Sequence, residues 1–210
     1  KANRKYELLS VHRLVSRDFK NMFSISFPIV FQSILGIGSW FLFFSFIENI
    51  GSRELEISNL LRTVYLILSI PCWGYSAGIN TMVSNFIGNR KRQAVLPLIV
   101  KTIKLNMLST FLISMPVLMF PEFLLYPLFG GEDMTLILIS KPYMLVIFVI
   151  LMVFSIGGIL INGLIGTGHT GTALRIQTIF TLVYIAYSIV MIKFSYHGLN
   201  WAWAAEIIYW

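Results

Sequence analysis

The chain has 210 residues, of which 57% are hydrophobic and 12% are charged, with a mean hydropathy of +0.78 and a formal net charge of +7. An average soluble domain carries roughly 25% charged residues, and a soluble domain of this size could not hide so much apolar surface from water. The composition therefore excludes an ordinary soluble enzyme and a disordered chain, and predicts an all-α, polytopic transmembrane helix bundle.

Apolar runs follow one another along the chain. A spanning helix needs about 20 predominantly apolar residues, and the sequence holds five full runs of that kind and the start of a sixth. The runs lie at Met22–Ile47, Ile57–Ile87, Leu96–Phe129, Met134–Ile165 and Ala173–Phe194, and the sixth starts near Leu199. We expect residues 1–21 to form a basic linker and residues 22–210 to form a truncated transmembrane lobe.

Four prolines lie inside or near the start of these runs, at Pro28, Pro71, Pro116 and Pro142. Proline lacks a backbone N–H and clashes with the preceding helical turn, so each predicts a kink or a helix start.

The connecting segments alternate in charge. Six of the sixteen basic residues lie in the first twenty positions, and the loops at Arg90–Arg92 and Arg175 are basic, whereas Glu48–Glu56 and Gly130–Asp133 are acidic. The positive-inside rule then places the N-terminus and the basic loops in the cytoplasm. We expect a multi-pass protein of the plasma (inner) membrane whose basic residues face lipid headgroups rather than nucleic acid.

The segment Ser10–Lys20 has apolar residues at near-helical spacing with basic residues between them. It is either an amphipathic helix on the inner membrane surface or a frayed basic linker.

Ionisable residues in a spanning segment are costly and are functional candidates. The candidates for coupling or gating are Glu48, which closes the first run, Arg62 in the second run and Glu206 in the last. Glu48 and Arg62 either form a structural ion pair near the outer surface or act in gating. Glu206, flanked by Trp and Tyr residues, lies either at the interface or on the transport pathway.

Uncharged polar, small and aromatic residues in the spans are candidates for lining a cavity. Amides bond across helices for ~1 kcal/mol, so packing is their alternative role, and a tryptophan either faces lipid or binds flat cations through its ring. The candidates are Gln32, Gly36, Trp40, Asn59, Asn80, Asn162 and Gln177.

The sequence shows no catalytic arrangement. Cys72 is the single cysteine, so neither a disulfide nor a thiolate metal site is expected. His12, His169 and His197 lack ligand spacing. We therefore expect no enzyme activity, no metal and no cofactor.

One stretch carries a family resemblance. After Pro28 and ten intervening residues comes the segment SWFLFFSFIENIGSRELEISNLLRTVYLILSIPCWGYSAGINTMVSNFIG. Further along, Ile165-Gly166-Thr167-Gly168 is followed by Thr170 after one residue. In order and spacing, most of Phe19–Trp210 resembles the C-terminal lobe of the multidrug and toxic compound extrusion (MATE) family.

The resemblance implies twelve spans in two six-helix lobes that export lipophilic or cationic compounds by alternating access, driven by a proton or sodium gradient. The sequence would then be a fragment holding spans seven to eleven and part of twelve. Its expected partners are the lipid bilayer, small-molecule substrates and the missing N-terminal lobe. Some members carry a Glu eight residues after the proline of span seven, where this chain has Gly36, and an acid in span ten, whereas Tyr143–Ile165 holds none. Proton coupling through the missing lobe is therefore at least as plausible as sodium coupling here.

Two other functions remain open at this point. A lipid-linked saccharide flippase of the same superfamily would need basic residues in the cavity, for which only Arg62 and Arg175 are candidates. A non-transporting membrane subunit would lack polar side chains that face a shared interior.

Overall fold

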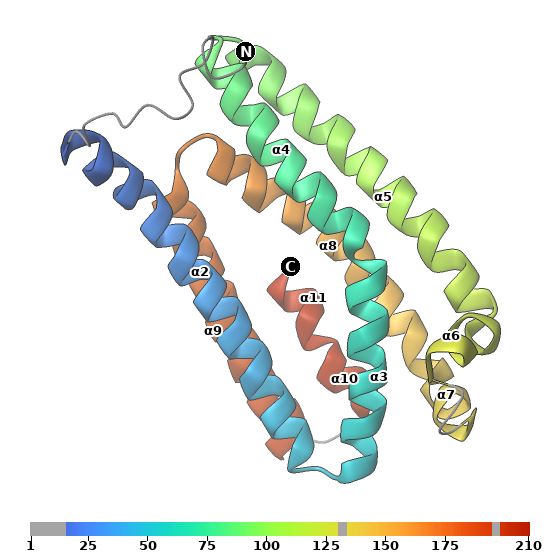
Figure 1. Ribbon diagram of the computed structural model, residues 1–210. Helices are drawn as coiled ribbons and strands as arrows, with labels where there is room; N and C mark the ends of the chain where they lie inside the picture. The colour runs from blue at the N-terminus through green and yellow to red at the C-terminus, as the bar shows by residue number, and fades with distance from the viewer. Residues whose placement is uncertain (1–15, 130–133, 195–197) are drawn as a thin grey trace, which may run out of the picture.

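The computed structural model describes residues 16–129, 134–194 and 198–210, and this part of the chain is helical without a strand (Figure 1). The all-α prediction is therefore confirmed. The helices are α2 (Ser16–Glu48), α3 (Ser52–Leu68), α4 (Ile70–Gly88), α5 (Val95–Met119), α6 (Pro121–Phe129), α7 (Met134–Ser140), α8 (Met144–Gly166), α9 (Thr170–Ile189), α10 (Leu199–Trp203) and α11 (Ala205–Tyr209). Short 3-10 turns η1 (Arg92–Ala94) and η2 (Lys141–Tyr143) precede α5 and α8, and a π-helical turn, η3 (Val190–Phe194), extends α9.

Four helical runs are long and apolar enough to cross a membrane, and a bent pair of helices would be a fifth. These runs agree with the five full spans expected from the sequence. The four are Arg17–Glu48, Arg92–Met119, Thr135–Gly166 and Thr170–Phe194, and the bent pair is Ser52–Leu68 with Ile70–Gly88.

The second run is not one straight helix. Between α3 and α4 the axis turns by 45° next to Pro71, which occupies the first turn of α4. Pro71 has no N–H to donate to the preceding turn. The hydrogen bonds from Ser69 N to the Tyr65 carbonyl and from Trp73 N to the Ser69 carbonyl hold the bend on either side. The kink or helix start predicted at Pro71 is confirmed.

The third run ends ten residues earlier than predicted, at Met119 rather than Phe129. Phe120 precedes Pro121 and has φ −133° and ψ 59°, outside the helical region, because the proline ring excludes the α conformation from the residue before it. The chain then turns into α6.

The segment Ser10–Lys20 straddles the edge of the described residues. Positions 10–15 lie outside them, and Ser16–Lys20 is the first part of α2, continuous with the first span.

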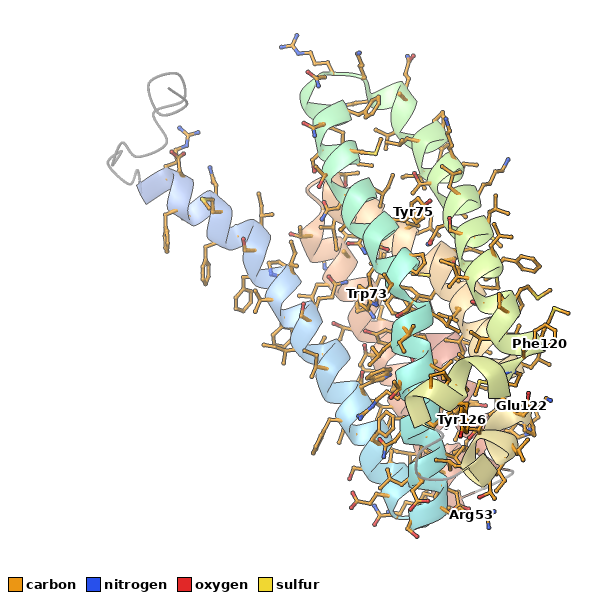
Figure 2. All side chains as sticks on the ribbon, turned by 45° about the vertical axis from the view of Figure 1, so that its right-hand side comes forward. Arg53, Trp73, Tyr75, Phe120, Glu122 and Tyr126 are labelled. Atoms are coloured by element: carbon orange, nitrogen blue, oxygen red, sulfur yellow. The ribbon has the colours of Figure 1, made fainter. Side chains whose placement is uncertain are left out.

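The connections alternate between the two ends of the bundle. The α4–α5 and α8–α9 connections share one end, and the α2–α3 turn lies at the other (Figure 1). Figure 2 shows Arg53, Glu122 and Tyr126 at the end opposite the α4–α5 connection. This alternation agrees with the predicted topology, while the assignment of the basic end to the cytoplasm stays a prediction.

Two packed groups of helices flank the short helices at the centre of the molecule. α2 lies along α9, and α8 packs against both α4 and α5. Glycines bring α8 close to α4, since a Cβ on Gly158 would lie 3.0 Å from Ser76 Oγ and one on Gly166 2.6 Å from the Asn80 carbonyl oxygen. The short helices α10 and α11 enter the space between the α2–α9 pair and the α3–α4–α8 group (Figure 1).

Candidate functional site

A buried carboxylate lies at the centre of the bundle. α11 carries Glu206, which is only 2% exposed. Its Oε1 atom accepts a hydrogen bond of 2.6 Å from Trp40 Nε1 on α2 and one of 3.0 Å from Tyr184 Oη on α9. Bonds of this kind to a carboxylate are roughly twice as strong as neutral ones. Of the two positions that the sequence left open for Glu206, the structure favours the interior over the membrane interface.

No cation neutralises this carboxylate within the described part of the chain. The one salt bridge found there joins Lys141 and Glu122, which are both solvent-accessible. The donors from Trp40 and Tyr184 both bond Oε1, and no hydrogen bond to Oε2 is found among the described residues. Because burying an unpaired charge is costly, a proton or a bound cation on Glu206 would lower the cost of its burial.

Aromatic side chains surround Glu206. The Trp40 ring lies 5.7 Å from that of Tyr65, and Tyr184 lies 5.6 Å from Tyr209, centroid to centroid. Trp210 stacks on Phe154 at 3.8 Å and donates a 3.0 Å hydrogen bond from Nε1 to Tyr65 Oη. A carboxylate that lies among aromatic rings is chemically suited to organic cations, because ring faces and the carboxylate both attract positive charge.

The polar lining continues along the facing sides of α2 and α9. Gln32, Gly36 and Trp40 are four residues apart and share one face of α2. Gln32 Nε2 donates to Gln177 Oε1 on α9 over 3.4 Å. A Cβ on Gly36 would stand 2.9 Å from Tyr209 Oη, so the glycine gives the tyrosine room. These candidates therefore lie on the helix faces that enclose Glu206.

Three other candidates lie elsewhere. Asn59 is exposed on α3. Asn80 packs its backbone against Gly166 near the α8–α9 end of the bundle. Asn162 Nδ2 donates to the carbonyl of Gly158 within α8. Among the described residues, none of the three forms a hydrogen bond with Glu206, whose side-chain donors are Trp40 and Tyr184.

The predicted ion pair between Glu48 and Arg62 is wrong. Glu48 ends α2 and is exposed, whereas Arg62 lies ten residues into α3, about 15 Å along the helix at 1.5 Å per residue. The Arg62 guanidinium instead lies over the Phe44 ring, 4.9 Å from its centroid. The axial offset separates the two charges, and a cation–π contact takes the place of the ion pair.

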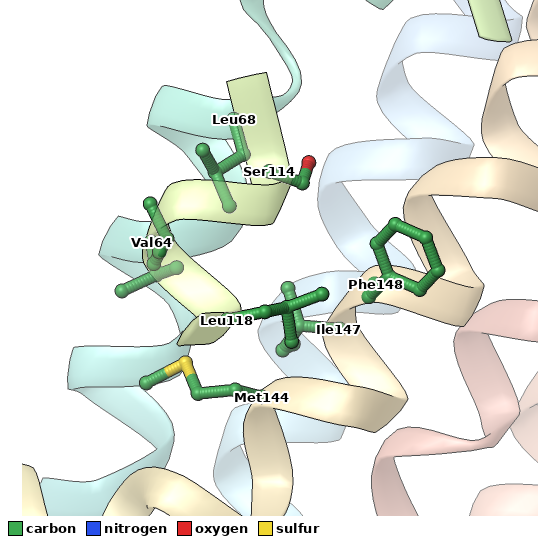
Figure 3. Close-up of a pocket in the computed structure, with 8 residues that line it drawn as sticks. Val64, Leu68, Ser114, Leu118, Met144, Ile147 and Phe148 are labelled. Atoms are coloured by element: carbon green, nitrogen blue, oxygen red, sulfur yellow. The ribbon is translucent and has the colours of Figure 1, made fainter. Parts of the chain in front are cut away.

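A small apolar cavity lies away from the Glu206 site. Val64 and Leu68 of α3, Ser114 and Leu118 of α5, and Met144 of α8 are among its lining residues (Figure 3). Its volume is about 10 Å³, which is at most enough for a single water. This cavity is therefore too small to hold an organic molecule.

Sequence reasoning missed the tyrosines. Tyr184 donates directly to Glu206, and Tyr65 and Tyr209 complete the aromatic surroundings. The available signal was the seven-residue spacing between Gln177 and Tyr184, which places both on one face of α9. Among the residues that the structure describes, no group of three or more His, Cys, Asp or Glu is placed to hold a metal ion.

The family model described as MatE matches residues 28–190, more than half of the chain. The matched segment includes Trp40, Gln177 and Tyr184, and Glu206 lies beyond it. No curated protein matches the chain.

Proposed function

The chain belongs to the MatE family of membrane transporters, and from that premise we propose that it forms part of a proton-coupled antiporter that exports lipophilic cations by alternating access. The observation that carries the proposal is the buried carboxylate of Glu206, held by Trp40 and Tyr184 and without a cationic partner among the described residues. An intramembrane carboxylate of this kind is a functional candidate.

In this proposal Glu206 exchanges one positive charge for another. A proton and a cationic substrate both neutralise the carboxylate, so binding of one favours release of the other. Trp40 and Tyr184 orient the carboxylate through their hydrogen bonds. The aromatic rings around it accept flat, apolar cations of different shapes, because the attraction between a cation and a ring face depends little on how the cation is oriented.

The chemistry around Glu206 favours a proton over sodium as the coupling ion. Hard metal cations take several oxygen ligands. The indole nitrogen of Trp40 is a donor only, so at 2.6 Å from Oε1 it turns an N–H toward the position that a metal ion would occupy. Tyr184 also donates to Oε1 rather than offering a second carboxylate.

The flippase alternative has less support. A lipid-linked saccharide carries phosphate and calls for basic residues in the cavity. Arg62 is over Phe44, Arg175 is exposed, and the charged side chain at the centre is the acidic Glu206. The polar side chains that converge there also disfavour a non-transporting subunit.

The test is efflux from proteoliposomes that hold the full-length transporter, with ethidium as the probe and a proton or a sodium gradient as the driving force. Glu206→Gln is expected to lower proton-driven efflux about ten- to a hundredfold, since losing an interaction with a charged group costs ~1.5–3 kcal/mol. The control Glu48→Gln removes an exposed carboxylate at the end of α2 and should retain the wild-type rate.

Equal amounts of folded protein are verified by size-exclusion chromatography before rates are compared. Wild-type efflux from Glu206→Gln would refute the role of this carboxylate. Efflux driven by the sodium gradient alone would refute the choice of proton.

A further inference from the structure

An open groove runs between α4 and α5, on a different face from the Glu206 site. Its volume is about 670 Å³, within the ~300–1,000 Å³ of typical ligand sites. The α4 wall includes Pro71, Gly74 and Gly78, and the α5 wall includes Leu98 and Leu105. These positions recur at helical spacing, so each wall is one continuous helix face.

Small residues keep the groove open. A Cβ added to Gly74 or to Gly78 would meet no atom within 4 Å. A hydrogen bond of 3.1 Å between Tyr75 Oη and Ser109 Oγ joins the two helices (Figure 2 shows Tyr75 beside α5). Apart from Lys101, Thr102 and the Tyr75 hydroxyl, the residues that line the groove are apolar, which suits a hydrocarbon chain.

One positively charged side chain lines this groove. Lys101 is exposed and belongs to the α5 wall. It lies six residues into α5, about 9 Å from the end of the helix that follows Arg90–Arg92. A lysine at this depth extends its ammonium toward the headgroup layer while its methylene stem stays in hydrocarbon. No carboxylate of the described chain forms a salt bridge with Lys101.

We propose that the α4–α5 groove binds an anionic phospholipid from the leaflet next to the Arg90–Arg92 loop, with an acyl chain along Gly74 and Gly78 and the phosphate on Lys101. Charge complementarity at one end of an apolar groove favours an anionic lipid. A neutral lipid would satisfy the walls but not the lysine, and a free phosphate would satisfy the lysine but not the walls. This site is independent of the transport function proposed for Glu206.

Lipid binding to the full-length protein in detergent tests the proposal. Native mass spectrometry compares phosphatidylglycerol with phosphatidylcholine of the same acyl chains. Wild type should retain phosphatidylglycerol more tightly. Lys101→Gln should weaken that binding about fivefold and leave phosphatidylcholine unchanged, the fold-change that corresponds to ~1 kcal/mol per basic residue near a membrane surface.

Two further variants separate the groove from general surface charge. Lys104→Gln removes a nearby exposed lysine that does not line the groove, and should change binding less than Lys101→Gln. Gly78→Leu places a side chain in the groove at a position where its Cβ meets no atom within 4 Å, so it should weaken the binding of both lipids.

Equal retention of the two lipids by wild type would overturn the proposal, as would equal losses from Lys101→Gln and Lys104→Gln. If Gly78→Leu keeps wild-type lipid binding, no acyl chain lies in the groove. If Gly78→Leu instead prevents folding in every detergent and lipid, the groove is filled by protein, and the proposal also fails.

Discussion

Replacing Gly166 with alanine is expected to destabilise the bundle, because α8 touches the backbone of α4 at this residue. A Cβ on Gly166 would stand 2.6 Å from the Asn80 carbonyl oxygen, 3.2 Å from Asn80 Cα and 3.0 Å from Val83 Cβ. Carbon atoms pack best at ~3.5–4.0 Å. Two of the three neighbours are backbone atoms that cannot rotate away, so the helices must separate.

The expected size follows from this geometry. The Val83 contact alone requires a shift of about 0.5 Å toward the ~3.5 Å optimum, and overpacking of this kind costs ~1–3 kcal/mol. The better helix propensity of alanine offsets up to ~1 kcal/mol. We therefore expect Gly166→Ala to lower the free energy of unfolding by up to about 3 kcal/mol.

Gly171→Ala is the matched control. Gly171 lies in the first turn of α9, and a Cβ there would meet nothing within 4 Å. The same change should therefore raise the free energy of unfolding by up to ~1 kcal/mol through propensity alone. Both changes in the free energy of unfolding are measured by unfolding the full-length protein with sodium dodecyl sulfate in mixed micelles and following the far-ultraviolet circular dichroism. Equal shifts for the two alanines, or a stabilising Gly166→Ala, would refute the close α4–α8 contact.

Two other predictions concern charged residues outside the Glu206 site. Arg62→Ala should lower the free energy of unfolding by ~0.5–2 kcal/mol through the lost cation–π contact, and Glu48→Ala should leave it nearly unchanged. The two effects should add within ~0.5 kcal/mol in a double-mutant cycle. A larger coupling energy would indicate that Glu48 and Arg62 form an ion pair and would contradict the structure. The 2.9 Å hydrogen bond from Lys141 lowers the pKa of Glu122 below its ordinary value. A carboxyl group whose pKa is lowered in the folded state stabilises the fold at a pH above its unfolded pKa, and this contribution disappears as the pH falls through the folded pKa. The Tm difference between wild type and Lys141→Ala should therefore be present at neutral pH and vanish in acid. A Tm difference that grows in acid would contradict the assignment.

The candidate site was only partly readable from the sequence. Gln32, Gly36 and Trp40 share a face because their spacing is helical, and a carboxylate in an apolar run was conspicuous at Glu206. The partner of that carboxylate was not readable, since Trp40 and Glu206 are 166 residues apart. Pairing across such a separation depends on which helices lie side by side, which the hydrophobic pattern of each helix does not specify.

The sequence by itself determined the class of molecule and the positions of its helices. Runs of about 20 apolar residues have no stable alternative to helix in a bilayer, because every backbone polar group must be satisfied within the segment. Pro71 sets a local break for a similar reason, whereas the predicted third run continued through Pro121 and the break there came from the structure. These are consequences of short-range chemistry and of the solvent.

Only the tertiary structure decided what each polar residue does. Arg62 lies over Phe44 rather than beside Glu48 because axial offset and helix rotation, which no local pattern encodes, set which side chains meet. Glu206 is a central buried group because α11 lies between two packed helix groups. Lys101 lines a groove because Gly74 and Gly78 place no side chain on the facing wall of α4. Non-local packing turns a residue in an apolar run into a lipid-facing, structural or functional one.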